Sequence, residues 1–141
     1  MNMMELLRKV TAVSGFTHAA GVEVVAAEAG DVTMTLAKKP ELLQFNGFFH
    51  GGIIAGLADH TAGAAATTTL PPGKIAVTVD LHINYLAPAN GETLSAKAHC
   101  VQSGNTICVV SVSVSTRRKG EDVVCAMATV TLRVVDMPRL P

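Results

Sequence analysis

The chain has 141 residues, of which 49% are hydrophobic and 16% are charged, and this length suits one domain with an ample core. Lysine and arginine number 11, as do aspartate and glutamate, so no net basic charge favours nucleic acid as a partner. The apolar content is more than one small domain comfortably hides, which favours a homo-oligomer.

The cysteines and the N-terminus indicate the compartment. Cys100, Cys108 and Cys125 are odd in number, form no closely spaced pair and fall in strand-like segments, where cysteine usually acts as a small apolar residue. We therefore expect a reducing, cytoplasmic location and no metal site. Residues 1–10 carry three charged side chains in place of a signal peptide's apolar core, and no apolar run reaches the ~18 residues of a membrane-spanning helix.

The N-terminal third of the chain predicts one helix followed by two strands. Residues 1–14 have the pattern of a short amphipathic helix. Its apolar side consists of Leu6, Leu7 and Val10. Residues 20–27 and 31–37 are rich in strand-forming residues, and the sequence at 29–31 is typical of a hairpin turn.

A long helix is expected in the middle of the chain. Apolar residues at helical spacing predict it from about Gly51 to Thr68, and the prolines at 71–72 end it because proline cannot continue a helix. Almost no polar residue interrupts it, so we expect a buried helix that encloses the carboxylate of Asp59. An enclosed carboxylate beside a cleft is a candidate functional group, although a solvent-facing aspartate is the ordinary alternative.

The start of this helix is a second candidate site. The first N–H groups of a helix have no partner within it, and glycine lets a ligand approach them closely, so Gly51 and Gly52 suit an oxyanion. The glycines could equally serve only a tight turn. Gly51 and Asp59 lie eight residues apart, about 12 Å along a helix, too far for one small carbonyl to contact both. If both act, the site must be shared between two chains related by a two-fold axis.

The second half of the chain predicts four strands. They cover residues 75–85, 93–101, 106–116 and 123–135, and we expect them to be antiparallel and joined in hairpins, with a loose tail at 136–141. In the first of them, strict alternation predicts one face formed by Ile75, Val77, Val79, Leu81, Ile83 and Tyr85. Two strands, a long helix and four strands indicate an α+β domain in which a sheet wraps around one buried helix.

Two motifs resemble a known family. Gly47, the His50-Gly51-Gly52 run and Leu57-Ala58-Asp59, with the later strand that ends Asn84-Tyr85-Leu86-Ala87-Pro88, resemble the acyl-CoA thioesterases of the hotdog fold, in particular their PaaI-type, phenylacetate-pathway branch. The resemblance covers about residues 42–130. It implies a hotdog fold, hydrolysis of a thioester to a free acid and coenzyme A, and a dimer or dimer of dimers. It implies no cofactor, because coenzyme A is part of the substrate.

The resemblance also implies roles for single residues. Asp59 would be the nucleophile or the general base, and the Gly51 N–H would polarise the thioester carbonyl. Gln44 matches the position of an amide that orients water or substrate, and Asn46 is the alternative residue for this role. Thr78 matches a serine or threonine that helps to place the water, although an ordinary strand residue is nearly as consistent with the pattern.

The remaining candidates concern the loop and the substrate. We place His50 with the catalytic set but expect its ring to stabilise the loop rather than to transfer protons. Gly52, Phe48 and Phe49 are candidates for substrate binding, and core packing is the alternative for the phenylalanines.

The basic run containing Arg117 and Arg118 could contact phosphates or simply form a solvated turn. His60 is expected to be structural or to lie at a subunit interface. The N-terminal helix could cap the domain or cover an acyl pocket.

Two other functions fit the same fold. A non-catalytic acyl-CoA-binding module would not need Asp59, and it would normally carry an additional effector segment. A hydratase or dehydratase would need a catalytic histidine paired with a carboxylate, which the central stretch lacks.

Overall fold

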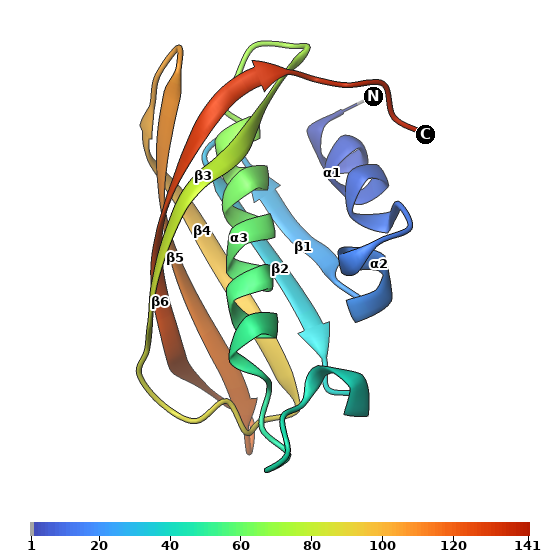
Figure 1. Ribbon diagram of the computed structural model, residues 1–141, viewed down its shortest axis with the longest axis vertical. Coiled ribbons are helices and arrows are strands. Elements are labelled where there is room, and N and C mark those ends of the chain that lie inside the picture. The colour runs from blue at the N-terminus through green and yellow to red at the C-terminus, as the bar shows by residue number, and fades with distance from the viewer. Residues whose placement is uncertain (1) are drawn as a thin grey trace.

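The computed structural model describes residues 2–141 and shows an antiparallel sheet curled around one long helix (Figure 1). The elements in chain order are α1 (Met3–Ala12), α2 (Phe16–Ala20), β1 (Glu23–Glu28), β2 (Asp31–Ala37), a 3₁₀ turn (Pro40–Leu42), α3 (Gly51–Thr67), β3 (Lys74–Tyr85), β4 (Thr93–Ser103), β5 (Ile107–Arg118) and β6 (Glu121–Asp136). The strand order is β1-β2-β4-β5-β6-β3, and all neighbours are antiparallel. The predicted α+β class, with a sheet wrapped around one central helix, is confirmed.

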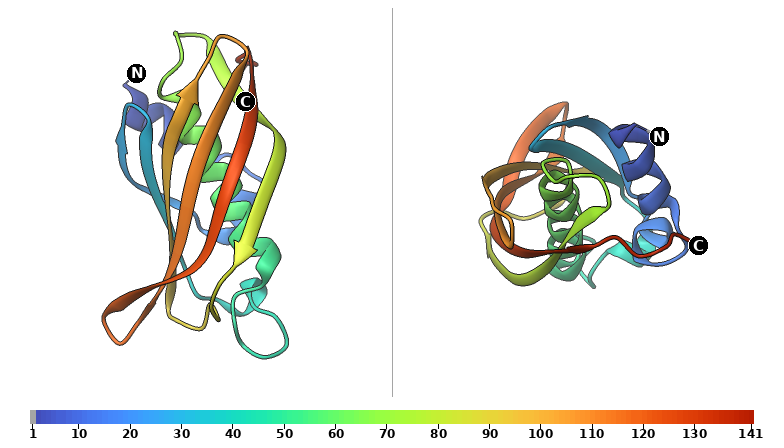
Figure 2. Two further views of the ribbon diagram at one scale, coloured as in Figure 1. Left: turned by 90° about the vertical axis from the view of Figure 1, so that its left-hand side faces the viewer. Right: turned by 90° about the horizontal axis from the view of Figure 1, so that it is seen from above.

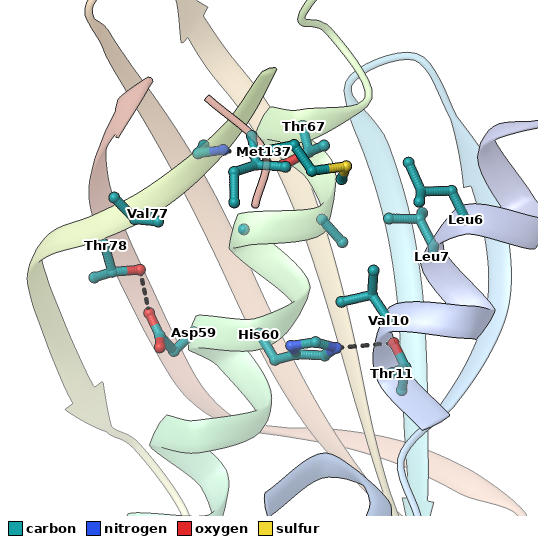
Figure 3. A pocket seen from close by; sticks show the side chains of 14 residues that line it. Leu6, Leu7, Val10, Thr11, Asp59, His60, Thr67, Val77, Thr78 and Met137 are labelled. Atoms are coloured by element: carbon teal, nitrogen blue, oxygen red, sulfur yellow. Dashed lines mark hydrogen bonds between the residues drawn. The ribbon is translucent and has the colours of Figure 1, made fainter. Parts of the chain in front are cut away.

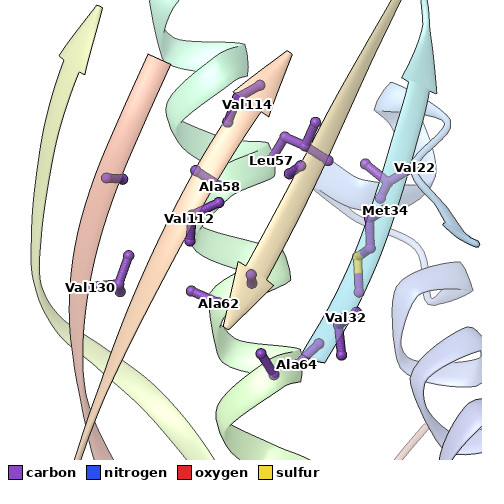
Figure 4. Packing of buried hydrophobic residues seen from close by; sticks show 14 of the residues in the cluster. Val22, Val32, Met34, Leu57, Ala58, Ala62, Ala64, Val112, Val114 and Val130 are labelled. Atoms are coloured by element: carbon purple, nitrogen blue, oxygen red, sulfur yellow. The ribbon is translucent and has the colours of Figure 1, made fainter. Parts of the chain in front are cut away.

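Helix α3 forms the centre of the core. Seen along its axis, it lies inside the curl of the sheet (Figure 2). Its small residues Ala58, Ala62 and Ala65 are fully buried, and they let the helix approach the strands closely. Figure 4 shows Ala58 and Ala62 beside Val112 of β5, and Leu57 near Val114 of the same strand. The prediction of a buried helix from Gly51 is therefore confirmed, and its end differs by one residue from the prediction.

The strands after β3 keep the predicted alternation. In β5, Val110, Val112 and Val114 are at most 1% exposed, and the serines between them lie on the other face. In β6 the residues that face α3 are Ala126, Ala128, Val130 and Leu132. The predicted inward faces of these two strands are confirmed.

Strand β3 departs from the predicted hairpins. It pairs with β6 and not with β4, which lies between β2 and β5. The segment between β3 and β4 instead crosses the ends of β5 and β6, where Leu86 N–H donates to Cys125 O at 2.8 Å and Glu92 N–H donates to Arg117 O at 3.0 Å. These are contacts between distant parts of the chain, so local turn residues do not reveal them.

A β-bulge also overturns the predicted face of β3. The register with β6 shifts between Thr78 and Asp80, and a bulge reverses the side to which following residues point. Val77 and Val79 are 41% and 58% exposed, whereas Leu81, which follows the bulge, packs against the core. Thr78, before the bulge, shares the face of the buried Ala76, and the bulge turns Leu81 and Ile83 to that same face.

The N-terminal segment forms two helices where one was predicted. Helix α1 starts at a capping box in which the side chains and backbone N–H groups of Asn2 and Glu5 bond reciprocally. Helix α2 overlaps the predicted first strand only at Ala20, and that strand starts at Glu23. Both helices lie beside β1 (Figure 1). In residues 2–141 no helix combines the length and hydropathy needed to cross a membrane.

Candidate active site

Asp59 and Thr78 form a hydrogen-bonded pair between α3 and β3. Asp59 lies two turns into α3, and the Thr78 hydroxyl donates to its Oδ1 at 2.6 Å (Figure 3). Asp59 is half-buried in the single chain rather than enclosed, because it opens into a cavity instead of packing against the sheet. The pair leaves the second carboxylate oxygen, Oδ2, without a hydrogen-bond partner within residues 2–141.

The start of α3 is held by two neighbouring side chains. His50 is the N-cap, and its Nδ1 accepts from Gly52 N–H at 2.9 Å. This bond is consistent with the expected stabilising role of the His50 ring, and it occupies one of the two glycine N–H groups. Tyr85 donates to Gly51 O at 2.7 Å, a contact that the sequence did not suggest. A Cβ on Gly51 would lie 3.3 Å from the Tyr85 ring, so glycine fits here partly for packing.

The Gly51 N–H remains the available donor at this end. As the first helical residue it has no acceptor inside α3, and the hydrogen bonds of residues 2–141 give it none outside the helix. The two candidate groups therefore lie on one helix, with Asp59 eight residues beyond Gly51, about 12 Å along the axis. One chain does not bring them together.

The loop before α3 is a tight hairpin that carries the remaining candidates. Gly47 N–H donates to Gln44 O at 3.0 Å, and Asn46 Oδ1 accepts from Phe48 N–H at 3.1 Å. Asn46 thus has a local structural role, while the Gln44 side chain makes no hydrogen bond within residues 2–141. Phe45, at the tip, is 99% exposed, an apolar side chain that the single chain leaves uncovered.

The two phenylalanines proposed for substrate binding differ in environment. Phe49 is 2% exposed and belongs to the core, so the packing explanation applies to it in the single chain. Phe48 is half-buried, and its role in substrate binding stays a prediction.

The basic run lies at the β5–β6 hairpin, at the edge of a cavity of about 460 Å³. Arg118 is exposed, and Arg117 pairs with Asp122 at 3.3 Å. Asn90 lines the same cavity, and its buried Oδ1 has no hydrogen-bond partner in residues 2–141. Two glutamates also line it, at positions 92 and 121, so the surroundings of the arginines are of mixed charge.

His60 connects α3 to the N-terminal helix. Its Nε2 lies 2.9 Å from the hydroxyl oxygen of Thr11 in α1 (Figure 3). Burial lowers the pKa of His60, and the charge of the adjacent Asp59 partly opposes this shift. The structural role expected for His60 is supported by this contact.

The cysteines and potential metal ligands form no site in the described chain. Cys100, Cys108 and Cys125 are all free, and the last two are buried. Within residues 2–141 no three His, Cys, Asp or Glu side chains gather as a set of metal ligands. The expected lack of a metal stays a prediction.

Comparison with known proteins identifies the family. The model of the thioesterase superfamily matches residues 46–131, more than half of the chain. Human acyl-coenzyme A thioesterase 13 is 29% identical over 122 residues, which are 85% of this chain and 86% of that protein.

Solved structures support the same assignment. A thioesterase family protein from Silicibacter pomeroyi has a TM-score of 0.92 at 26% identity, covering 96% of this chain and 100% of that one. The Escherichia coli PaaI protein, at 18% identity and a TM-score of 0.78, covers 95% of this chain and 96% of its own, and shares the fold. The predicted resemblance is confirmed: the chain belongs to the thioesterase superfamily, has the hotdog fold and is, by family, a thioester hydrolase.

Proposed function

We propose that the protein hydrolyses acyl-CoA thioesters to a free carboxylic acid and coenzyme A, in a site shared between two copies of the chain. The observation that carries this proposal is the Asp59–Thr78 pair, a carboxylate fixed by a 2.6 Å hydrogen bond at the edge of a largely apolar cavity. Such cavities with a few placed polar groups are typical of ligand sites. The human relative named above is an acyl-CoA thioesterase.

Asp59 can act in either of two ways. As a general base it accepts a proton from water while the water oxygen attacks the thioester carbonyl carbon. The carbon–sulfur bond then breaks, and the coenzyme A sulfur leaves and takes up a proton. As a nucleophile, Asp59 itself attacks, releases the thiol and forms a mixed anhydride that water hydrolyses. In both routes the Thr78 hydroxyl positions the carboxylate.

The carbonyl oxygen gains negative charge in both routes and needs a donor. We assign this role to the Gly51 N–H of the other chain, because the Gly51 N–H has no acceptor in the described part of its own chain and lies far from its own Asp59. Gln44, on the loop before the same helix, would orient the water or substrate. No metal or organic cofactor is needed for these steps.

The free edge of β3 supports a two-fold dimer. Strand β3 is the last strand of the sheet order, spans 12 residues and carries exposed Val77 and Val79. A long apolar edge strand is prone to pair with another chain. Pairing of two β3 edges would bring α3 of each copy toward the other. A further pairing of dimers and a cytoplasmic location are parts of the same proposal.

We assign the coenzyme A phosphates to Arg117 and Arg118. Their support is the charge of the guanidinium groups and the cavity beside the hairpin. The glutamates at 92 and 121 line the same cavity, so the phosphates would have to lie on the arginine side of it.

Thiol release from a panel of acyl-CoA esters tests the function. Wild type should release coenzyme A, and Asp59→Asn should lower kcat by at least 10²-fold, as expected for the loss of a catalytic base or nucleophile. Asp31→Asn is the matched control, since Asp31 is exposed and pairs with His99 on another part of the sheet. Full activity in Asp59→Asn would refute the assigned role of Asp59. Tight ester binding without release by wild type would indicate the binding module instead.

A further inference from the structure

A cavity of about 290 Å³ lies between α1, α3, β3 and the residue that follows β6. Asp59 and Thr78 line one part of it, and Met137 lines another (Figure 3). Helix α1 contributes Leu6 and Val10 to the opposite wall. The cavity is therefore bounded by the proposed catalytic pair and by elements that the proposed function leaves without a role.

The cavity extends along α3 away from the catalytic pair. Asp59, Gly63 and Thr67 all line it, and residues at this four-residue spacing share one face of a helix. Asp59 and Thr67 are separated by eight residues, about 12 Å along the axis. In Figure 3 Met137 lies beside Thr67, at the end remote from Asp59. Its N–H donates to Gly73 O at 2.9 Å, which anchors the start of the tail there.

Several of the polar groups in the lining are paired with one another. Thr78 bonds Asp59, Thr11 bonds His60, and Thr67 Oγ1 accepts from Ala76 N–H at 3.2 Å. Burial lowers the pKa of His60, which leaves the middle of the wall uncharged near neutral pH. The rest of the lining is apolar. A hydroxyl or charged group placed beyond Asp59 would lose its water in a lining that offers few polar partners.

The size of the cavity indicates the length of the group that it can enclose. At roughly 30 Å³ for each water-sized group, a volume of about 290 Å³ has room for about ten non-hydrogen atoms. This volume is at the small end of the range for ligand pockets. A hexanoyl or octanoyl group fits, whereas a hexadecanoyl chain exceeds the space.

We propose that this cavity receives the acyl group of the substrate, that the preferred substrates are unsubstituted apolar acyl groups of short to medium length, and that Val10 and Met137 set the length limit. The proposal rests on the proposed thioesterase function. In this proposal α1 closes one side of the acyl site. The helix can do so because it packs against β1 and contacts the cavity side of α3 through the Thr11–His60 hydrogen bond.

Rates with esters of graded length test the proposal. The value of kcat/KM should rise from acetyl-CoA to about octanoyl-CoA and fall by at least tenfold at hexadecanoyl-CoA. A 3-hydroxyoctanoyl ester should be about 10- to 100-fold poorer than octanoyl-CoA, the discrimination that an apolar pocket achieves against an added hydroxyl.

Two variants should shift the length preference in opposite directions. Val10→Phe narrows the cavity and should lower the octanoyl-to-acetyl ratio of kcat/KM about tenfold, since each misfitting methylene costs about that factor. Met137→Ala removes the far wall and should move the optimum toward longer chains. Ala12→Leu is the matched control, because Ala12 is exposed on the same helix and outside the cavity. Circular dichroism of each variant verifies folding.

The outcomes separate the two proposals. Thiol release by wild type with the same length ratio in Val10→Phe, Met137→Ala and Ala12→Leu would overturn the acyl-site assignment and leave the thioesterase function intact. Equal rates for octanoyl and 3-hydroxyoctanoyl esters would overturn the apolar substrate class. No release from any ester would overturn the proposed function and, with it, this inference.

Discussion

The Thr78 hydroxyl donates a 2.6 Å hydrogen bond to Oδ1 of Asp59, and Thr78 lies on the same face of β3 as the buried Ala76. Hydrogen bonds to charged groups contribute about 1.5–3 kcal/mol. If this bond orients the carboxylate for attack, its loss affects the chemical step more than substrate binding.

Thr78→Val should therefore lower kcat about 10- to 100-fold with little change in KM, since valine keeps the shape of threonine without the donor. Thr78→Ser restores a hydroxyl and should recover most of the rate. Steady-state kinetics of both variants measure this. Equal kcat values for wild type and Thr78→Val would show that the hydroxyl is only a strand residue.

The Gly51 N–H can be removed with little damage to the helix. Proline is tolerated at the first helical position, and the preceding His50 has the extended conformation (φ −64°, ψ 139°) that a following proline requires. Gly51→Pro should lower kcat by about 10²–10³-fold, the usual effect of losing an oxyanion donor. Gly51→Ala also places a Cβ 3.3 Å from Tyr85. Because it keeps the N–H, it should lose less activity than Gly51→Pro.

Mixing two inactive variants tests whether the site is shared. In a heterodimer of Gly51→Pro and Asp59→Asn, one of the two sites combines an intact Gly51 N–H with an intact Asp59. Statistical mixing of subunits should restore about a quarter of wild-type activity. Each variant refolded alone is the control. No recovery, with heterodimers demonstrated by mass spectrometry, would place both groups in one chain.

The exposed edge of β3 predicts a specific effect on assembly. A lysine on an edge strand opposes pairing with another strand, so Val79→Lys should shift the protein toward monomer and lower activity in parallel. Val101→Lys is a matched control, because Val101 is 63% exposed on β4, away from this edge. Sedimentation velocity gives the distribution of species. A monomeric wild type, or equal dimerisation of both variants, would contradict this assembly.

His60 predicts a pH dependence of stability. Its pKa is lowered by burial in the folded protein from an ordinary value of 6.5, so below about pH 6.5 the unfolded chain binds a proton that the native state does not. Stability from this group is complete above that pH and falls as the pH decreases, by at most about 1.4 kcal/mol per pH unit.

His60→Gln removes this titration while retaining a partner for Thr11. Urea unfolding between pH 7.5 and 5.5 should show a smaller loss of stability in His60→Gln than in wild type. His18→Gln, a change at an exposed position, should follow wild type. Identical pH profiles for wild type and His60→Gln would refute the buried, neutral state of His60.

Several features could be predicted from the sequence because they depend on neighbouring residues. The apolar spacing after Gly51 and the prolines at 71–72 define α3 with an error of one residue. Alternation gives the inward faces of β5 and β6. The family motif singled out Asp59 and Thr78, and the structure brings these two together.

Other features follow only from contacts between segments far apart in the chain. The pairing of β3 with β6, the bulge at Thr78, the Tyr85–Gly51 contact and the cavity under α1 all join residues that no local pattern relates. Periodicity reports which side of an element is apolar, but not which element covers that side. The sequence by itself determined the central helix and its acid, whereas tertiary packing decided what lies opposite that acid.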